Sequence, residues 1–140
     1  MTLSHRPIRS ALYIPGSKPR ALEKARNLPT DSIIFDLEDA VSAESKSEAR
    51  AILRAALEQG GYGPRLKIVR INALDTPLGE ADLQALDGLD LDAVLLPKVN
   101  SAGDLDTLAD VVGEKWPLWA MLETPLGILN VGELAAYPLL

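Results

Sequence analysis

Charged side chains lie at the ends of three apolar segments of this chain. Arg70 closes one segment, Glu123 directly follows a second, and Asp36 and Glu38 stand at the end of a third. In parallel α/β barrels the carboxyl ends of the strands carry the catalytic groups. An arginine and several carboxylates on neighbouring strand ends are suited to bind a divalent cation and an oxyanion together. The pattern therefore predicts a magnesium-and-oxyanion site.

The acidic residues allow two interpretations. Asp36 and Glu38 are two positions apart, so they face the same side of an extended chain, and such a pair suits a hard cation that prefers oxygen ligands. Alternatively, one of them pairs with a basic residue and Asp39 caps a turn. Glu123 is open to the same alternatives, namely a metal ligand, a partner for a strand-end cation such as Lys98, or an exposed loop acid.

The basic residues are equally open. Arg70 carries a permanent charge on a planar fork that fits a carboxylate or an enolate oxygen, but it could also form a structural salt bridge, and both can hold together. A buried lysine can be a Schiff-base nucleophile. For Lys98, which follows Pro97, an electrostatic or salt-bridge role is the favoured interpretation. His5 is the only histidine and lies in an N-terminal segment that is not expected to supply a base.

The segments that position these residues alternate between strand-like and helix-like patterns. Strands are predicted at residues 10–14, 32–37, 66–71, 93–96 and 118–122. Helices are predicted at residues 18–27, 43–58, 79–86, 101–112 and 126–136, with Ser17 and Ser101 as N-caps. Five strand–helix units without hairpin signals predict a parallel sheet, and near-continuous apolar strands predict burial on both of its faces.

Two parallel architectures compete, an open doubly wound sheet and a (β/α)8 barrel. Gly16 lacks the Gly-x-Gly-x-x-Gly pattern of a dinucleotide-binding turn, and charged residues at several strand ends favour the barrel. The predicted fold is therefore α/β, a partial (β/α)8 TIM barrel of about five βα units. Residues 1–140 are expected to form one domain, the N-terminal portion of a barrel whose remainder is absent, because a whole barrel takes about 250 residues.

Composition narrows the function classes. The 14 basic and 20 acidic residues give a net charge of −6, which argues against nucleic acid or an anionic membrane as a partner. The absence of cysteine excludes disulfides, thiolate metal sites and a cysteine nucleophile. No secretion signal or membrane-spanning apolar run is evident, so a cytoplasmic location is expected.

Several segments resemble, in their order along the chain, one known family. These segments are Arg9-Ser10-Ala11-Leu12-Tyr13-Ile14-Pro15-Gly16, Asp36-Leu37-Glu38-Asp39-Ala40-Val41, Lys46 with Arg50, Val69-Arg70-Ile71-Asn72, Leu96-Pro97-Lys98-Val99 and Glu123-Thr124-Pro125. Together they resemble the citrate lyase β-subunit and malyl-CoA lyase family, within the barrels that include the HpcH/HpaI aldolases. The resemblance covers nearly the whole chain.

The resemblance implies a magnesium-dependent enzyme. It would cleave a carbon–carbon bond of a CoA thioester such as citryl-CoA or malyl-CoA, giving an acetyl-type CoA ester and a 2-oxo acid. By this similarity Glu123 is a catalytic magnesium ligand, while Arg70 is a catalytic residue that binds the oxo acid and stabilises the enolate oxygen. Asp36 and Glu38 would stand behind them, holding the water molecules of the metal.

Three further positions are expected to contact substrate by the same resemblance, namely Lys98, Pro15 and Gly16. The family supplies a second metal carboxylate from the sixth strand, which would lie beyond residue 140. Two alternatives remain open, a CoA-independent aldolase acting on 4-hydroxy-2-oxo acids and an inactive, truncated structural fragment. We expect a homo-oligomer rather than a stable, active monomer, because the strands at 10–14 and 118–122 would be open edges.

We expect Arg70→Lys to lower turnover by about two to three orders of magnitude, the size typical of one lost oxyanion donor. Lysine keeps the charge but loses the planar fork that a bidentate contact requires. Steady-state turnover of a CoA thioester is the measurement, and a near-wild-type rate would leave Arg70 with a structural ion pair alone.

Overall fold

Five parallel strands form a single sheet in this computed structural model, which describes residues 7–140. The strands are β1 (Ala11–Pro15), β2 (Ser32–Asp36), β3 (Leu66–Arg70), β4 (Ala93–Leu96) and β5 (Leu118–Ala120). They pair in the order β1-β2-β3-β4-β5, so each βα unit adds its strand beside the previous one. The predicted parallel sheet is confirmed, with strand ends that differ by up to two residues. His5 lies outside the described residues.

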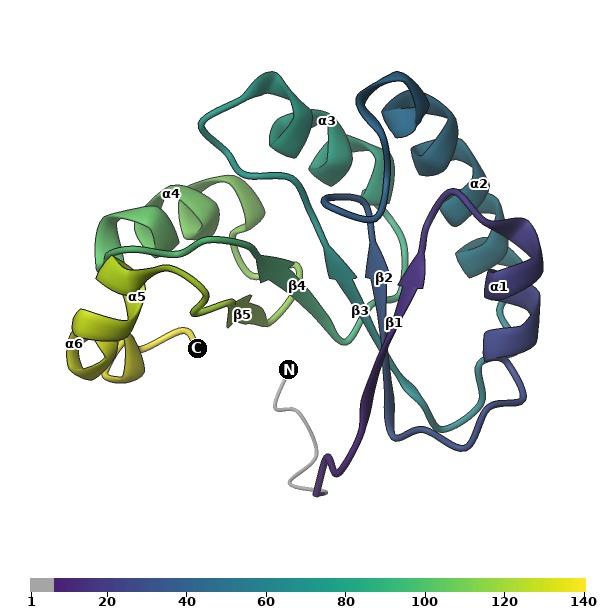
Figure 1. Cartoon of the computed structure of the whole chain (residues 1–140), viewed down its shortest axis with the longest axis horizontal. Helices are drawn as coiled ribbons and strands as arrows, with labels where there is room; N and C mark the ends of the chain where they lie inside the picture. The colour runs from purple at the N-terminus through teal and green to yellow at the C-terminus, as the bar shows by residue number, and fades with distance from the viewer. Residues whose placement is uncertain (1–6) are drawn as a thin grey trace.

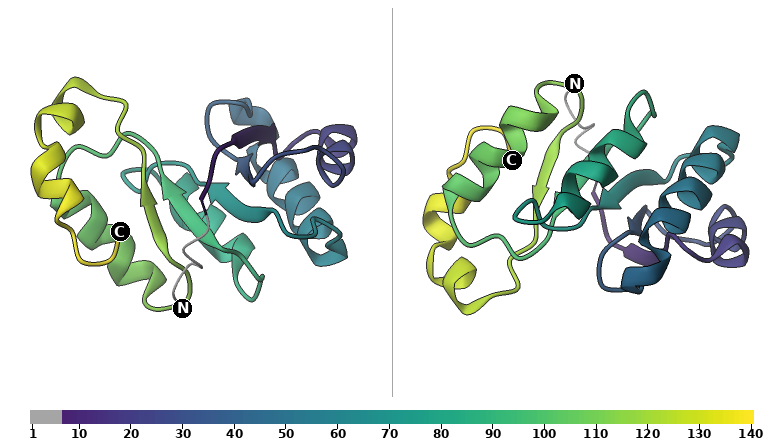
Figure 2. Two further views of the ribbon diagram at one scale, coloured as in Figure 1. Left: turned by 90° about the horizontal axis from the view of Figure 1, so that it is seen from below. Right: turned by 90° about the horizontal axis from the view of Figure 1, so that it is seen from above.

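The helices cover one side of this sheet. They are α1 (Pro19–Ala25), the 3-10 turn η1 (Ala43–Ser45), α2 (Lys46–Gln59), α3 (Pro77–Leu86), α4 (Ala102–Val112), α5 (Pro125–Leu129) and α6 (Val131–Ala135). In Figure 1, helices α1 to α4 follow the convex side of the curved sheet, and Figure 2 shows the same arrangement from below and above. Sequential strand order with helices on one side is the arrangement of a (β/α)8 barrel segment rather than of a doubly wound sheet, as predicted.

Alternating strand residues build two separate cores. One set, which includes Ile33, Phe35 and Val69, packs with the helices in a large buried cluster. The other set forms a smaller cluster on the opposite face around Ile68 and Leu95. Burial on both faces explains why these strands are apolar at nearly every position. Within residues 7–140, no helix has the length and apolar content of a membrane span.

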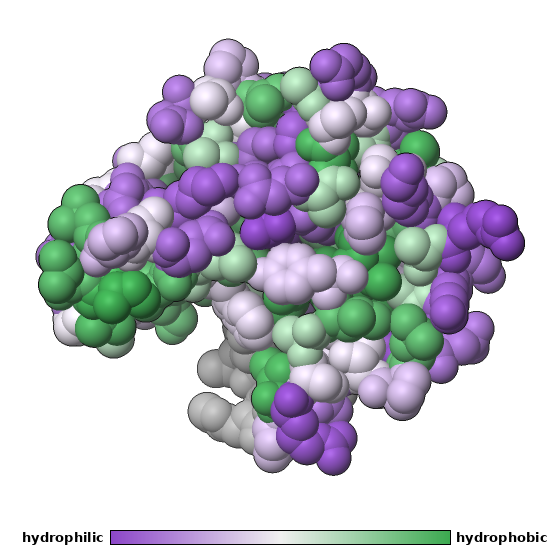
Figure 3. Space-filling view, viewed as in Figure 1, coloured by the Kyte–Doolittle hydropathy of each residue, from purple (hydrophilic) through white to green (hydrophobic). Residues whose placement is uncertain are grey.

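The two edges of the described sheet are β1 and β5, as predicted. Beside β5, helices α5 and α6 and the following residues carry exposed apolar side chains, which Figure 3 shows as a green area on the left of the molecule. These side chains are Leu126, Ile128, Leu129, Val131, Leu139 and Leu140. An apolar patch beside an open edge suits association with further protein. The expected homo-oligomer stays a prediction.

The helix predicted at 126–136 is wrong as a single element, because α5 and α6 are separate. Asn130 lies between them, and its side-chain amide donates to the carbonyl of Asn100 at 2.8 Å. This contact joins the junction of the two helices to the loop that follows β4. The predicted N-cap Ser17 is also wrong: Lys18 holds that position because Pro19, with its fixed φ, opens α1.

The start of α4 follows the prediction. The Asp104 carboxylate accepts hydrogen bonds from the backbone amides of Asn100 and Ser101, at 2.8 and 3.0 Å. Ser101 and Asp104 form the capping box that satisfies the first amides of the helix. This cap fixes the chain just after the end of β4.

Gly79 lets α3 approach the end of β3 closely. A Cβ atom there would lie 2.6 Å from the carbonyl oxygen of Asn72 and 2.7 Å from that of Ala73.

We expect Gly79→Ala to lower the free energy of unfolding by about 1–3 kcal/mol through overpacking. Gly132→Ala in α6 is the control, because its Cβ meets open space and alanine favours helix by up to about 1 kcal/mol. Urea denaturation of both variants is the measurement, and equal effects would contradict the close approach.

Candidate functional site

The carboxyl ends of the strands meet at one edge of the sheet. The register aligns Pro15 with Asp36, Asp36 with Arg70, and Arg70 with Leu95 across β1 to β4. Asp36 and Arg70 are therefore direct neighbours on adjacent strands, although 34 positions separate them in the chain. The structure thus brings together two of the residues that the sequence analysis selected.

Asp36 and Arg70 form a buried, bidentate ion pair. Arg70 Nε donates to Asp36 Oδ1 and Arg70 Nη2 to Asp36 Oδ2, each at 2.7 Å. The side chains are 1% and 8% exposed. Each Asp36 oxygen accepts a second hydrogen bond at 2.9 Å, from the backbone amide of Glu38 or of Ala40. Asp36 therefore orients Arg70 and the turn after β2 at the same time.

The groups around Asp36 and Arg70 favour the charged form of both side chains. Burial alone would raise the pKa of the Asp36 carboxyl, but the hydrogen bonds from Arg70 and from the amides of Glu38 and Ala40 hold that pKa below its usual range. The hydrogen bond to Asp36 raises the pKa of the Arg70 guanidinium. The salt-bridge interpretation of Arg70 is confirmed, and its contact with an oxo acid stays a prediction.

One end of the Arg70 guanidinium is held less tightly. Its Nη1 atom is 3.4 Å from Glu38 Oε2 and 3.5 Å from the Met121 sulfur. The ring of Tyr13 lies beneath the guanidinium, 4.9 Å from its carbon to the ring centroid, a cation–π contact. Tyr13 and Met121 were missed as neighbours, because only the folded sheet brings β1 and the segment after β5 to Arg70.

Lys98 joins three strand ends. Its ammonium group contacts Glu38 Oε1 and is 3.5 Å from Asp39 Oδ1, while its backbone amide donates to Glu123 Oε1 at 2.9 Å. The hydrogen bond to Glu38 raises the pKa of Lys98. The predicted salt-bridge role of Lys98 is confirmed.

Glu123 has the features of a single carboxylate ligand. The residue is exposed, and within residues 7–140 its second oxygen, Oε2, has no hydrogen-bond partner. Magnesium commonly binds one or two carboxylates and completes its shell with water and substrate oxygens. Glu123 fits that role. No group of three or more His, Cys, Asp or Glu residues in the described part of the chain could hold a metal alone.

A second buried network supports the site from behind, and the sequence analysis missed it. Asp82 of α3 is fully buried and accepts hydrogen bonds from Arg50 Nε and from the backbone amide of Asn72, both at 2.7 Å. Asn72 Nδ2 also donates to the carbonyl of Leu37. The spacing of residues along α3 could have indicated this burial, because Asp82 shares the buried face of the helix with Gly79, Leu83 and Leu86.

Lys46 and Gly16 fix the turns beside Asp36. The Lys46 ammonium donates to the carbonyls of Leu37 and Glu38 at 2.8 and 2.6 Å. Gly16 donates its amide to the Asp36 carbonyl at 2.8 Å, and a Cβ atom at Gly16 would lie 2.9 Å from a methyl group of Leu37. Pro15 ends β1 beside Asp36. Close packing explains why a glycine stands at position 16. Contact of Pro15 and Gly16 with a substrate stays a prediction.

Comparison with known proteins supports the resemblance. Residues 9–140 match the model of the HpcH/HpaI aldolase/citrate lyase family. A (3S)-malyl-CoA thioesterase of Cereibacter sphaeroides is 54% identical over 132 residues, covering 94% of this chain and 46% of the relative. An L-malyl-CoA/beta-methylmalyl-CoA lyase of the same species is 37% identical over 143 residues, covering 94% and 45%.

A solved structure agrees. The citrate lyase beta subunit of M. tuberculosis, complexed with oxaloacetate and magnesium, superimposes with a TM-score of 0.74 at 32% identity, covering 91% of this chain and 53% of that one. The chain spans about half the length of the curated relatives it matches. The sequence analysis did not anticipate a thioesterase among the relatives.

We expect Asp36→Asn to lower the free energy of unfolding at pH 7 by about 3 kcal/mol, because it removes the bidentate carboxylate that compensates the buried charge of Arg70. The Asp36 pKa is depressed in the folded state, so its stabilisation is complete above the unfolded-state pKa of about 3.9 and fades as pH falls through the lower, folded-state value. The gap between wild type and variant should therefore narrow below about pH 4. Denaturant melts at several pH values measure this gap, with Asp90→Asn, in an exposed ion pair with Lys67, as the control. A gap that is independent of pH would contradict the assignment.

Proposed function

The chain belongs to the HpcH/HpaI aldolase/citrate lyase family, and on that premise we propose that the protein is a magnesium-dependent carbon–carbon lyase. Its substrate would be a CoA thioester of a hydroxy acid, such as malyl-CoA or citryl-CoA. The observation that carries the proposal is the fixed guanidinium of Arg70 on the same sheet edge as the exposed carboxylate of Glu123, with Lys98 bonded to the acids on either side.

The reaction breaks the bond between the hydroxyl-bearing carbon and the carbon next to the thioester. The hydroxyl group loses its proton to a base and becomes the carbonyl group of a 2-oxo acid. The bonding electrons pass to the thioester as an enolate, whose carbon then takes up a proton to give the shortened CoA ester. Magnesium bound to Glu123 would act there as a Lewis acid on the substrate oxygens. The Nη1 end of Arg70 would hold the acid and oppose the negative charge that develops on oxygen.

Asp36 contributes through Arg70. Because its two short hydrogen bonds fix the guanidinium plane before substrate arrives, Arg70 loses little freedom on binding. The Tyr13 ring beneath the guanidinium restricts the same group from one face. A charge that is already oriented is the arrangement that stabilises a transition state most effectively.

Thioester hydrolysis is a second candidate function, and the 54% identity to a (3S)-malyl-CoA thioesterase favours it. In that reaction water attacks the thioester carbonyl, the carbon–sulfur bond breaks, and the products are the free hydroxy acid and CoA. Both reactions require a bound acid group and a stabilised oxyanion, so the same charged residues support both.

A product assay separates these functions. The full-length protein is incubated with magnesium and malyl-CoA or citryl-CoA, and products are resolved by chromatography. Equal amounts of a 2-oxo acid and a shortened CoA ester, without free thiol, are expected of the lyase. Free CoA without 2-oxo acid would assign the hydrolase. Release of pyruvate from a 4-hydroxy-2-oxo acid without any thioester would assign the aldolase, and no turnover in any assay would contradict the enzymatic proposal.

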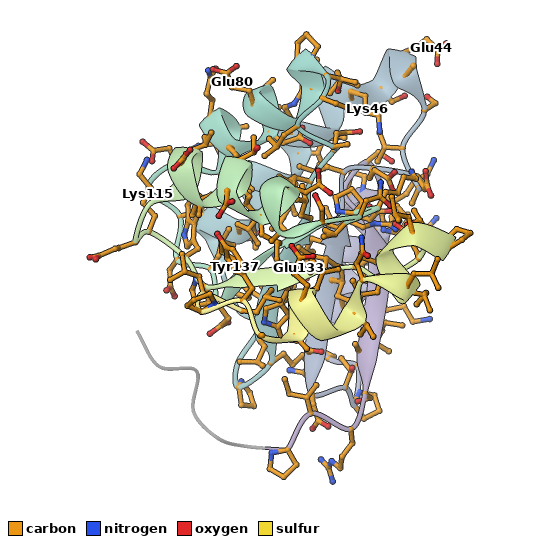
Figure 4. All side chains as sticks on the ribbon, turned by 90° about the vertical axis from the view of Figure 1, so that its left-hand side faces the viewer. Glu44, Lys46, Glu80, Lys115, Glu133 and Tyr137 are labelled. Carbon is orange, nitrogen blue, oxygen red and sulfur yellow. The ribbon has the colours of Figure 1, made fainter. Side chains whose placement is uncertain are left out.

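We expect Glu123→Gln to abolish magnesium-dependent turnover while the protein stays folded. The amide keeps the shape of the side chain but removes the charge that a hard cation needs. Glu133→Gln is the control, because Glu133 is an exposed acid on α6, labelled in Figure 4. Turnover and circular dichroism are measured on both. Activity of Glu123→Gln within about threefold of wild type would exclude Glu123 as the ligand.

A further inference from the structure

We propose that Lys98 is a positioning residue that keeps Arg70 available for the substrate by drawing the Glu38 carboxylate away from it. This inference rests on the proposed function, in which Arg70 binds the oxo acid. It differs from the expected role of Lys98 as a direct substrate contact. The two roles predict opposite results when Glu38 is also changed.

The first argument is the unequal use of the Arg70 donors. Nε and Nη2 are both 2.7 Å from Asp36 oxygens, so that side of the guanidinium is committed. Nη1 faces Glu38 at 3.4 Å, a separation that is 0.7 Å longer than the contacts with Asp36. Nη1 is therefore the donor that a substrate oxygen can take.

The second argument is the competition for Glu38. Its side chain is 8% exposed, and a carboxylate buried to that degree needs a partner. Two cations are in reach of its carboxylate oxygens, Lys98 at Oε1 and Arg70 at Oε2. Glu38 Oε2 also accepts a hydrogen bond from the Asp39 amide at 3.0 Å, but without the Lys98 ammonium group Arg70 Nη1 would be the remaining cation in contact with the Glu38 carboxylate. The carboxylate would then occupy the donor that the oxo acid requires.

The third argument is the backbone of Lys98. Its φ is 53°, and it is the only non-glycine residue with a positive φ between residues 7 and 140. Such a conformation is unfavourable for a residue with a side chain and persists where surrounding contacts hold it. The ladder between the β4 and β5 segments resumes at Val99, whose amide donates to Met121. Lys98 is thus turned out of the ladder, with its amide toward Glu123 and its ammonium group toward Glu38.

The test uses Lys98→Met, which keeps the unbranched stem and removes the charge. Affinity for oxaloacetate is measured by isothermal titration calorimetry with saturating magnesium. We expect binding to weaken by about 10-fold or more, within the range typical of residues that support a ligand site. Glu38→Gln added to Lys98→Met removes the competing charge, so the double variant should bind more tightly than Lys98→Met and within about threefold of Glu38→Gln alone. Glu38→Gln alone is the reference for this comparison, because it also removes whatever Glu38 contributes to holding the water molecules of the metal.

The rescue separates positioning from direct contact. If Lys98 touches the substrate, the double variant will bind as weakly as Lys98→Met, and the inference is overturned. Wild-type affinity in Lys98→Met overturns it as well. If the unchanged protein binds neither oxaloacetate nor glyoxylate, the 2-oxo acids that citryl-CoA and malyl-CoA would release, in the presence of magnesium, the proposed function itself is contradicted. This outcome can be told apart from failure of the inference, in which the unchanged protein binds and Lys98→Met binds equally tightly.

Two controls exclude a general loss of structure. Lys115→Met removes a lysine of similar exposure, 56% against 49%, that pairs with Asp87 outside the site and is labelled in Figure 4. It should leave the dissociation constant unchanged. Lys98→Asn is the second variant at the same position, because asparagine tolerates the left-handed conformation better. Rescue by Glu38→Gln should appear in both Lys98 backgrounds, and thermal melts establish that each variant is folded.

Discussion

The buried ion pair between Asp36 and Arg70 is the interaction on which the arrangement of the strand ends depends. Removing two charges from water is expensive, and their attraction repays this cost only with good geometry and further hydrogen bonds. Here the register of β2 and β3 places the two residues side by side, and two backbone amides complete the shell of Asp36. The turn after β2 therefore has to adopt the conformation that presents these amides. An electrostatic requirement thus dictates local backbone structure.

Beyond this pair, two cations compete for one carboxylate. Glu38 stands between Arg70 and Lys98, and Lys98 in turn donates its amide to Glu123. Behind it, Asp82 holds the backbone of Asn72. Each carboxylate has at least one donor from another segment, so the acids near the site are held in place by partners far away in sequence. This explains how strand ends without a compact metal cluster within residues 7–140 can still form an ordered charged edge.

The sequence predicted the strands and helices better than it predicted the side-chain contacts between them. Alternating strand and helix patterns specify parallel units, and charged residues such as Arg70 and Glu123 stand out after apolar runs. The contact between Glu38 and Lys98 joins residues 60 positions apart, and no spacing rule encodes such a contact. The break at Asn130 was also not predicted, and the side chain of Asn130 contacts the carbonyl of Asn100, 30 positions earlier in the chain. Asp82 has the sequence context of an exposed acidic residue on a helix, and only the packing of α3 shows that it is buried.

On the proposed function, the charged strand ends would recognise an acid group, which both candidate reactions require. Relatives of this chain include both a lyase and a thioesterase, and both chemistries need a stabilised oxyanion. A hydrolase often relies on a serine or cysteine activated by histidine. This sequence contains no cysteine, and its single histidine, His5, lies outside the described residues. On the proposed function, the fixed guanidinium of Arg70 would serve either reaction, because each develops negative charge on an oxygen of the substrate.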